Sequence, residues 1–257
     1  MSKTDLSAFS LTGKRILVTG ANTGIGQGIA VSIARVGGFV VGVGRSAMAE
    51  TAGKVAAVGG SFEAVHCDLG DPVAAQAMLD RVWDESGPLD GLVNNAGIIR
   101  RADAVDLSET DWDDVLEVNL KTVFMLSQGF ARRVLADPGR RGKIVNIASV
   151  LSFQGGIRVA SYTASKHGVL GITRLLACEW AAKGINVNAI APGYIETNNT
   201  EALRADPDRS AAILARIPAG RWGEPEDIGD AAVFLLAPAS NYMHGAVVPV
   251  DGGWLAR

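Results

Sequence analysis

A tyrosine and a lysine with the spacing of an acid–base pair stand near the start of a long helical pattern. They are Tyr162 and Lys166, in the run Tyr-Thr-Ala-Ser-Lys. Residues four apart share one face of a helix, so the ammonium group can lie near the phenol. A free phenol has a pKa near 10, and a depression of about three units, or roughly 4 kcal/mol, would suit it to proton transfer near neutrality. A cation about 4 Å away at an effective dielectric of about 20 supplies that much, so we expect Lys166 to lower the pKa of Tyr162.

Two polar residues elsewhere in the chain could assist this pair. Ser149 follows the apolar run Lys143–Ile147, which predicts a strand, and α/β sheets place ligand-facing groups at strand ends. Its hydroxyl could donate a hydrogen bond to a substrate oxygen on which negative charge develops. Asn119 lies inside an otherwise apolar helical pattern. Because a buried amide is costly when it lacks hydrogen bonds, Asn119 needs partners from elsewhere in the fold.

A glycine-rich turn joins the first predicted strand to the first predicted helix. Its sequence is Gly20-Ala21-Asn22-Thr23-Gly24-Ile25-Gly26. Glycine permits positive φ and lets the backbone approach a pyrophosphate closely, and the helix N-terminus offers unpaired amides to that anion. No G-x-x-x-x-G-K-S/T run occurs, which argues against a P-loop nucleotide hydrolase. We interpret the turn as part of a dinucleotide site, with a purely structural turn as the alternative.

Apolar runs of strand length alternate with helical patterns along the chain. The predicted strands are Arg15–Thr19, Phe39–Val43, Phe62–His66, Gly91–Val93, Lys143–Ile147, Ile185–Ile190 and Ala246–Val250. The predicted helices are Gly24–Val36, Met48–Ala57, Pro72–Glu85, Asp111–Leu135, Val159–Ala182 and Glu226–Leu236. Several strands are apolar throughout, as expected where helices cover both faces. The alternation predicts an α/β fold, a single-domain Rossmann-type doubly wound parallel sheet of about seven strands with helices on both faces.

The stretch 197–216 departs from this alternation. It is polar, contains Pro207 and follows a predicted strand. A small helical lid over a site fits it, and a solvated surface insertion fits nearly as well. Since no linker or repeat divides the chain, we expect one domain over residues 1–257, with a substrate lid at about 197–216.

Composition argues against several classes of protein. The chain has 257 residues, 48% of them hydrophobic, and a formal charge of −3, which attracts neither a nucleic-acid backbone nor an anionic membrane surface. No run approaches the roughly 20 apolar residues that span a bilayer. Cys67 and Cys178 lack disulfide or metal-site spacing, and their apolar surroundings predict buried free thiols. The first residues lack the apolar stretch of a signal peptide, so we expect a cytoplasmic protein without a metal.

These motifs resemble those of the short-chain dehydrogenase/reductase family. Along the chain they are Gly20-x-x-x-Gly24-x-Gly26, Asp68, Asn94-Asn95-Ala96-Gly97, Asn119, Ser149, Tyr162-x-x-x-Lys166 and Pro192-Gly193. The resemblance extends from Leu11 to the end of the chain. It implies an enzyme that moves a hydride between a nicotinamide cofactor and an alcohol or ketone.

The resemblance assigns roles to four catalytic residues. Tyr162 would be the general acid/base, and Ser149 would donate to the substrate oxygen. Lys166 would lower the pKa of the tyrosine and hold the nicotinamide ribose. Asn119 would position a water that links Lys166 to solvent.

The resemblance also implies a set of cofactor-binding residues. Asp68 resembles the residue that hydrogen-bonds adenine, Asn95 would lie beside the adenosine ribose, and the segment from Pro192 to Thr197 would flank the nicotinamide and the pyrophosphate. The alternative for Asp68 and Thr197 is that each caps the helical stretch that follows. The expected set is Gly20, Asn22, Thr23, Gly24, Ile25, Gly26, Arg45, Asp68, Leu69, Asn95, Ala96, Gly97, Tyr162, Lys166, Pro192, Gly193, Ile195 and Thr197.

The residues after the second predicted strand bear on the choice of nucleotide. NAD-specific members of the family usually carry an acid there for the ribose 2′-hydroxyl, whereas this chain has Gly44 followed by Arg45. An arginine suits a 2′-phosphate, and the absence of the acid removes a repulsion. Thr23 stands where many NADP-preferring members place an arginine, which argues the other way. We expect NADP to be favoured over NAD.

Three stretches resemble one branch of the family, the gluconate 5-dehydrogenases and 2-dehydro-3-deoxygluconate 5-dehydrogenases. They are residues 98–101, 152–158 and 192–200. The resemblance implies a sugar acid that is oxidised or reduced at carbon 5. A carboxylate needs an arginine or a group of backbone amides, and hydroxyls need amide side chains. The expected substrate residues are Ser149, Gln154, Arg100, Arg158, Tyr194 and Asn199, with Arg221 as a further candidate for the carboxylate.

Two alternatives share this fold. A 3-oxoacyl-carrier-protein reductase has the same catalytic residues and would need a basic surface for its carrier protein. A non-catalytic NAD(P)-binding regulator typically lacks the tyrosine or the lysine, whereas Tyr162 and Lys166 are both present. The family resemblance further implies a homotetramer, in which helices 111–135 and 159–182 pack across a two-fold axis.

Overall fold

Seven parallel strands form the centre of the protein. The computed structural model describes residues 5–257, so residues 1–4 of the expected domain lie outside the described residues. The strand order is β3-β2-β1-β4-β5-β6-β7. The chain adds β1 to β3 toward one edge of the sheet and β4 to β7 toward the other. The predicted doubly wound sheet is therefore confirmed. The strands are β1 (Arg15–Thr19), β2 (Phe39–Gly44), β3 (Ser61–His66), β4 (Gly91–Asn94), β5 (Gly142–Ile147), β6 (Ile185–Pro192) and β7 (Val247–Val250).

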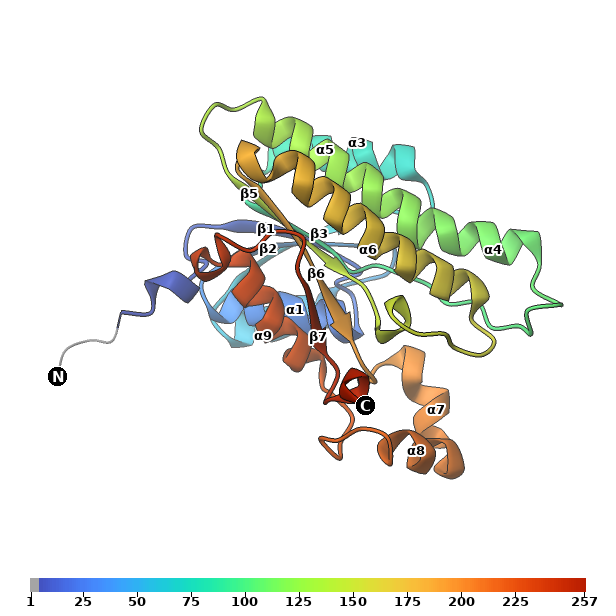
Figure 1. Ribbon diagram of the computed structural model, residues 1–257. Helices are drawn as coiled ribbons and strands as arrows, with labels where there is room; N and C mark the ends of the chain where they lie inside the picture. Colours follow the sequence, from blue (N-terminus) through green and yellow to red (C-terminus); the bar gives the residue numbers. More distant parts are fainter. Residues whose placement is uncertain (1–4) are drawn as a thin grey trace.

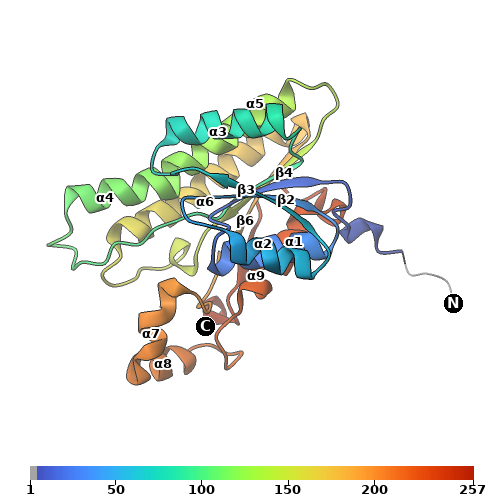
Figure 2. The same ribbon diagram turned by 180° about the vertical axis from the view of Figure 1, so that it is seen from behind.

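Helices cover both faces of this sheet, which explains why its central strands are apolar throughout. All of β6 is buried, for example. Helices α1 (Gly24–Arg35), α2 (Ala49–Ala57) and α9 (Pro225–Leu236) pack on one face. Helices α3 (Pro72–Glu85), α4 (Glu109–Leu116), α5 (Thr122–Leu135) and α6 (Ala160–Trp180) lie on the other face. The two layers are seen from opposite sides in Figures 1 and 2.

Helices α1 and α9 touch through small residues. A Cβ atom added at Gly28 of α1 would lie 2.6 Å from Pro225, and one at Gly229 of α9 would overlap the hydroxyl of Ser32. That hydroxyl also donates to Asp230 Oδ1 at 2.9 Å. Close backbone approach of this kind gives a tight helix pair, because the glycines leave no side chain between the two axes.

The predicted helix 111–135 is not one regular helix. A five-residue π-turn, Glu117–Lys121, separates α4 from α5. It contains Asn119, whose side chain is fully buried. A π-turn carries i→i+5 hydrogen bonds and is frequent at functional sites. The interruption therefore falls at the residue that the sequence singled out.

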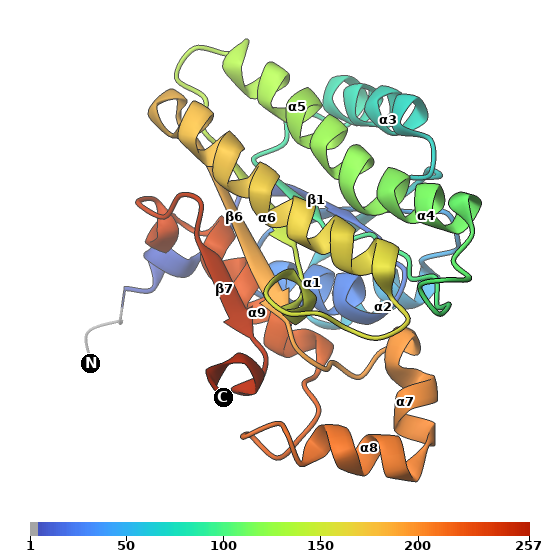
Figure 3. The same ribbon diagram turned by 45° about the vertical axis from the view of Figure 1, so that its right-hand side comes forward.

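The polar stretch 197–216 forms two short helices beside the sheet. They are α7 (Glu201–Ala205) and α8 (Pro207–Leu214), and Asp206 caps α8 by accepting from the amides of Asp208 and Arg209. Figure 3 shows both helices set apart from the two helical layers, at the end of the sheet where β6 and β7 finish. This is the carboxyl edge of the parallel strands, where ligand sites of open α/β sheets lie.

The two cysteines, both of which were expected to be buried, differ in exposure. Cys67 is buried as predicted, but Cys178 is exposed. It lies on a face of α6 that also exposes Leu175, so the apolar run around it does not mean that the thiol is buried. Within residues 5–257, no helix is long and apolar enough to cross a membrane.

Candidate active site

A cleft of about 1430 Å³ lies along the carboxyl edge of the sheet. Its walls come from the turns after five strands and from the segment that holds α7 and α8. Every expected cofactor residue lines it, and so does every expected substrate residue except Arg158 and the further candidate Arg221. Of the four expected catalytic residues, only Asn119 does not line the cleft.

The glycine turn closes tightly at one end of the cleft. Gly20 and Gly24 have positive φ, 67° and 56°, which other residues rarely adopt. A Cβ atom at Gly26 would overlap the Gly20 carbonyl and lie 2.5 Å from the Asn95 amide. That amide donates to the carbonyls of Thr19, at 2.8 Å, and Gly20, at 3.3 Å. Asn95 therefore holds the glycine turn through hydrogen bonds to its backbone. This structural role is additional to the expected place of Asn95 beside the ribose.

The start of α1 suits an anion such as a pyrophosphate. Thr23 is the residue directly before the helix, and its side chain forms no capping hydrogen bond with the helix amides. The first amides of α1 are thus free to bind an anion, and the helix dipole adds to the attraction. A Cβ atom at Gly24 would lie 3.2 Å from the Thr197 methyl group. The turn and the beginning of the segment that carries α7 therefore face each other across the cleft.

The end of β2 offers a cation and small polar groups. The Asn22 amide donates to the Ser46 hydroxyl at 2.8 Å, and a Cβ atom at Gly44 would lie 3.1 Å from Asn22 Oδ1. Gly44, Arg45 and Ser46 all line the cleft. Arg45 forms no ion pair with any carboxylate of the part of the chain that the structure describes. A cation and two small polar side chains thus surround the place where the adenosine ribose is expected.

Asp68 folds back on its own turn. Its Oδ1 accepts from the Gly70 amide at 2.9 Å, and the residue also lines the cleft. The cap of α3 is a different aspartate, Asp71, which accepts from Val73 and Ala74. Capping of α3 therefore does not explain Asp68. Thr197, in contrast, stands at the cap of a 3-10 turn, Asn198–Thr200.

Tyr162 and Lys166 lie as their spacing predicts, on one face of α6 and in the cleft. The Lys166 ammonium is 5.6 Å from the centroid of the Tyr162 ring. It donates to the Ile147 carbonyl at 2.6 Å, and the side chain is 4% exposed. Because burial disfavours the charged form, the pKa of Lys166 falls to about 8.

The expected lowering of the tyrosine pKa by Lys166 is wrong for this arrangement. Burial raises the pKa of the Tyr162 hydroxyl above its ordinary value, and the Ser149 hydroxyl and the charge of Arg101 only partly oppose that rise. Lys166 directs its ammonium to the Ile147 carbonyl instead. The spacing of the pair determined the shared face but not the depth of burial, which decides the direction.

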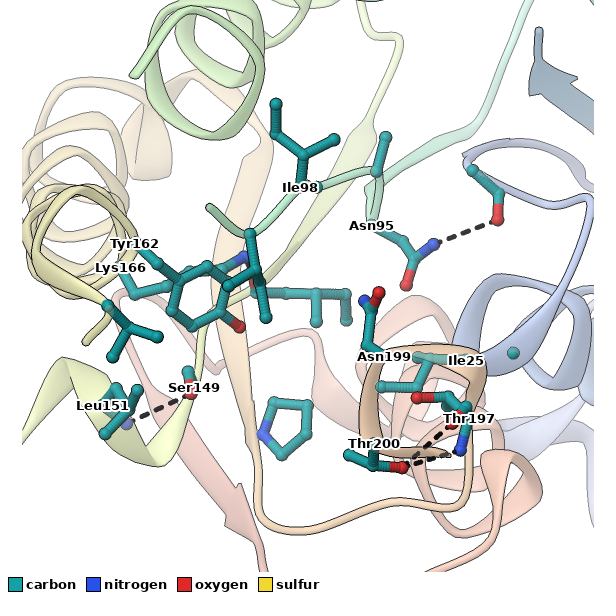
Figure 4. A pocket seen from close by; sticks show the side chains of 18 of the residues that line it. Ile25, Asn95, Ile98, Ser149, Leu151, Tyr162, Lys166, Thr197, Asn199 and Thr200 are labelled. Carbon is teal, nitrogen blue, oxygen red and sulfur yellow. Dashed lines mark hydrogen bonds between the residues drawn. The ribbon is translucent and has the colours of Figure 1, made fainter. Parts of the chain in front are cut away.

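Ser149 is held beside Tyr162 by the turn that follows β5. Figure 4 shows both side chains reaching into the same open space, with Asn199 on the far side. The Ser149 oxygen accepts from the Leu151 amide at 3.1 Å, which leaves the hydroxyl proton for an acceptor in the cleft. Ser152 ties this turn to α6 by donating to the Lys166 carbonyl at 2.7 Å.

Asn119 finds the partners that its burial demands. Its Oδ1 accepts from the Ile98 amide at 2.8 Å, and its Nδ2 donates to the Ile98 carbonyl at 3.0 Å and to Ser165 Oγ at 3.3 Å. It thereby joins the segment after β4 to α6 from behind the cleft. The structure thus gives Asn119 a positioning role, while its expected role toward a water stays a prediction.

Comparison with known proteins agrees with this geometry. The family model described as enoyl-(acyl carrier protein) reductase matches residues 20–255. The 2-dehydro-3-deoxy-D-gluconate 5-dehydrogenase of Dickeya dadantii is 57% identical over 252 residues, which are 98% of this chain and 99% of the relative. The chain belongs to the short-chain dehydrogenase/reductase family. It is therefore an oxidoreductase, and the reading as a regulator without activity is set aside.

Two further relatives show which branch of the family is more similar to this chain. A solved structure from Agrobacterium tumefaciens, a provisionally named 2-deoxy-D-gluconate 3-dehydrogenase with bound NADP, is 62% identical with a TM-score of 0.91 and covers 97% of this chain and 99% of its own. A 3-oxoacyl-(acyl-carrier-protein) reductase of Vibrio cholerae is 38% identical and covers 95% of this chain and 98% of the relative. The sugar-acid branch of this short-chain dehydrogenase family is the more similar one.

On the substrate side of this dehydrogenase cleft, the predicted arginines are already paired. Arg158 lies outside the cleft lining and contacts Asp103 at 3.3 Å. Arg100 lines the cleft but contacts Asp111 at 3.0 Å and Asp114 at 3.2 Å. The further candidate, Arg221, forms a two-bond pair with Asp227. Each guanidinium thus has a carboxylate partner within the protein, which weakens the case that it binds a substrate carboxylate.

Other cleft residues were assigned no role from the sequence, although Arg216 and Trp254 lie in stretches that also resemble the sugar-acid branch. Arg101 donates to the Asn199 carbonyl at 3.3 Å, across the cleft. Arg209, Arg216 and Trp254 also line the cleft. The polar stretch 197–216 was the signal for two of them, but spacing alone does not tell which arginines lack an acidic partner. Among residues 5–257, no group of three or more His, Cys, Asp or Glu side chains could hold a metal ion.

Proposed function

We propose that the protein is an NAD(P)-dependent dehydrogenase that oxidises a sugar acid, or reduces its ketone, at carbon 5. The observation that carries the proposal is the polar cleft in which Tyr162 and Ser149 face a segment rich in amides and arginines. The names of the similar proteins from Dickeya dadantii and Agrobacterium tumefaciens support a gluconate-like acid. These names differ in the carbon they specify, so the product must be identified in the test.

The residues of the chain supply proton transfer and orientation. A bound nicotinamide dinucleotide would accept or deliver the hydride. Ser149 donates a hydrogen bond to the substrate oxygen and keeps its proton. Tyr162 takes the proton from that oxygen during oxidation or returns it during reduction. Lys166, held by the Ile147 carbonyl, lies where a ribose hydroxyl could reach it. In the same scheme Asn119 positions a water that connects Lys166 to solvent.

A substrate panel tests this function directly. Initial rates are measured with D-gluconate, 2-dehydro-3-deoxy-D-gluconate, simple secondary alcohols and, in the reducing direction, an acetoacetyl thioester, each with both nucleotides. We expect the highest kcat/KM with a sugar acid, because a site that pairs several polar groups rejects analogues that leave them unpaired. Product analysis then shows which carbon is oxidised.

The second candidate function is a 3-oxoacyl-carrier-protein reductase. The description of the matching family model and the similarity to the Vibrio cholerae reductase favour it. The panel separates the two functions. A higher kcat/KM with the acetoacetyl thioester than with any sugar acid would replace the first proposal by this one.

For the nucleotide, we favour NADP over NAD because of the groups around Arg45. If Arg45 binds the 2′-phosphate, Arg45→Ala should weaken NADPH binding by about 1.5–3 kcal/mol, the usual contribution of a charge-assisted hydrogen bond. NADH binding should hardly change. Titration of both nucleotides checks this, and equal losses for the two would refute the contact.

Three further features belong to the same proposal. Residues 1–257 form one domain, and the segment 197–216 acts as a lid over the substrate. The protein works as a homotetramer in the cytoplasm. Leu175, which is 51% exposed on α6, would lie in the interface if this helix packs against a second copy.

A further inference from the structure

Two arginines of the lid segment line the cleft without a carboxylate partner among the described residues. Four other arginines near the cleft have such partners: Arg100, Arg158, Arg204 and Arg221. Arg45 and Arg101 lack one as well, but Arg45 lies at the end of β2 and Arg101 donates to the Asn199 carbonyl. Arg209 and Arg216 line the cleft, yet neither forms an ion pair or a side-chain hydrogen bond with any of residues 5–257. Their positive charges are therefore available to an anion from outside the protein.

Trp254 carries a second unsatisfied group at the same place. The residue lines the cleft and is only 3% exposed, but its indole N–H has no partner among the described residues. A buried donor without an acceptor is costly, so such groups in native proteins usually have a partner that binds there. The guanidinium of Arg216 lies 4.0 Å above the Trp254 ring. The cation thus stacks on the face of the ring whose edge carries the N–H donor.

The fold holds Trp254 in position from several directions. Gly252 and Gly253 both have positive φ, and Asp251 accepts from the amides of Gly253 and Leu255 at 2.9 Å each. The Tyr194 ring packs against Trp254 at 4.7 Å between centroids. A donor that is fixed in this way loses little conformational entropy when a ligand binds.

The same cluster reaches both the lid and the catalytic serine. Burial raises the pKa of the Tyr194 hydroxyl, and the charges of Arg216 and Arg209 oppose that rise, so both guanidinium groups lie near it. Trp254 also packs in one apolar cluster with Val150, the residue next to Ser149. A molecule whose reacting carbon lies at Ser149 and Tyr162 can therefore extend toward these cations.

We propose that Arg216, with Arg209 and the Trp254 indole N–H, binds the carboxylate of the sugar acid. This inference rests on the proposed function and adds the residues that select an acid over a neutral sugar. The planar guanidinium matches a carboxylate, and stacking on the indole leaves its N–H edge free to donate. Trp254 adds a hydrogen bond from a direction that Arg216 cannot cover.

Steady-state kinetics with a charged and a neutral substrate test the inference. D-gluconate and D-gluconamide have the same length and differ in the carboxylate. We expect Arg216→Gln to lower kcat/KM for gluconate by about 10- to 100-fold, mainly through KM, and to change the value for gluconamide by less than about threefold. Trp254→Phe keeps an aromatic face for Arg216 but replaces the indole by a smaller ring without the N–H, and should lower kcat/KM for gluconate about three- to tenfold.

Arg158→Gln is the matched control, since it removes the same charge at the rim from a side chain that contacts Asp103. It should leave both substrates unchanged. Equal losses for gluconate and gluconamide in Arg216→Gln, no loss at all, or a loss as large in Arg158→Gln would overturn the inference while the proposed function stands. A wild-type protein that oxidises neither compound and reduces the thioester would overturn both.

Discussion

Lys166 carries a positive charge in a place where burial works against it. The side chain is 4% exposed, and its pKa falls to about 8. In the unfolded chain a lysine keeps its ordinary, higher pKa, so the unfolded state binds the proton more tightly. The charge therefore costs stability below about pH 8, and this cost disappears as the pH rises from there toward the unfolded value.

Substitution of Lys166 makes this cost measurable. We expect the wild-type free energy of unfolding to improve relative to that of Lys166→Met by up to about 3 kcal/mol between pH 7 and pH 10. Urea titrations of both proteins at several pH values give the difference directly, and other titrating groups cancel. A difference that stays constant across this range would contradict the lowered pKa.

Tyr162 is the residue on which turnover should depend most. Tyr162→Phe removes the proton donor but keeps the ring, so we expect kcat to fall by at least about 10²–10³-fold while nucleotide affinity stays nearly unchanged. Tyr242→Phe provides the control, because Tyr242 is 99% exposed. Retention of a tenth of the wild-type kcat would show that another group transfers the proton.

For single residues, sequence spacing predicted where a side chain lies better than it predicted the burial and the charged neighbours of that side chain. Tyr162 and Ser149 lie together in the cleft as expected. The direction of the Tyr162 pKa shift was predicted wrongly, because burial raises that pKa and burial depends on elements far away in the sequence. The same limit applies to Arg158, which contacts Asp103 outside the cleft. Cys178 lies in an apolar run, but its face of α6 points outward.

At the scale of elements, a glycine in the turn before α1 and a glycine in α2 should respond in opposite ways to substitution by alanine. Gly26→Ala places a methyl group against the Gly20 carbonyl and the Asn95 amide, so we expect a destabilised turn and nucleotide binding weakened by tenfold or more. Gly53→Ala, in α2, meets nothing within 4 Å and should stabilise the protein by up to about 1 kcal/mol. Thermal unfolding and nucleotide titration of both variants check the contrast. Similar effects of the two changes would contradict the close approach.

The strands and most helices were predictable from the sequence to within a few residues, since apolar runs and glycine turns define them. The π-turn Glu117–Lys121 was not. One extra residue in a single helical turn changes the spacing of the apolar residues too little for the sequence pattern to reveal the π-turn. For the segment 197–216 the sequence favoured a small helical lid only slightly over a solvated insertion, and it gave no bounds for the two helices that form there. Short helices such as α7 depend on their caps and neighbours more than on periodicity.

For the whole molecule, the exposed side of α6 bears on assembly. Leu175 is 51% exposed there, and the proposed tetramer would bury it against a second copy of this helix. Leu175→Glu should then shift the mass in solution toward smaller species, because a buried charge without a partner is costly. Light scattering over a range of concentrations measures this. An unchanged mass would place the interface on another surface.

The tight contact between α1 and α9 has a mechanical consequence. The lid segment begins after β6 and returns to the fold at α9, whose glycine-mediated contact with α1 fixes that end. The other end is held at the glycine turn, because a Cβ atom at Gly24 would lie 3.2 Å from the Thr197 methyl group. Within the proposed function, a displacement of α7 and α8 would therefore disturb the nucleotide site at Thr197 as well as the substrate side of the cleft.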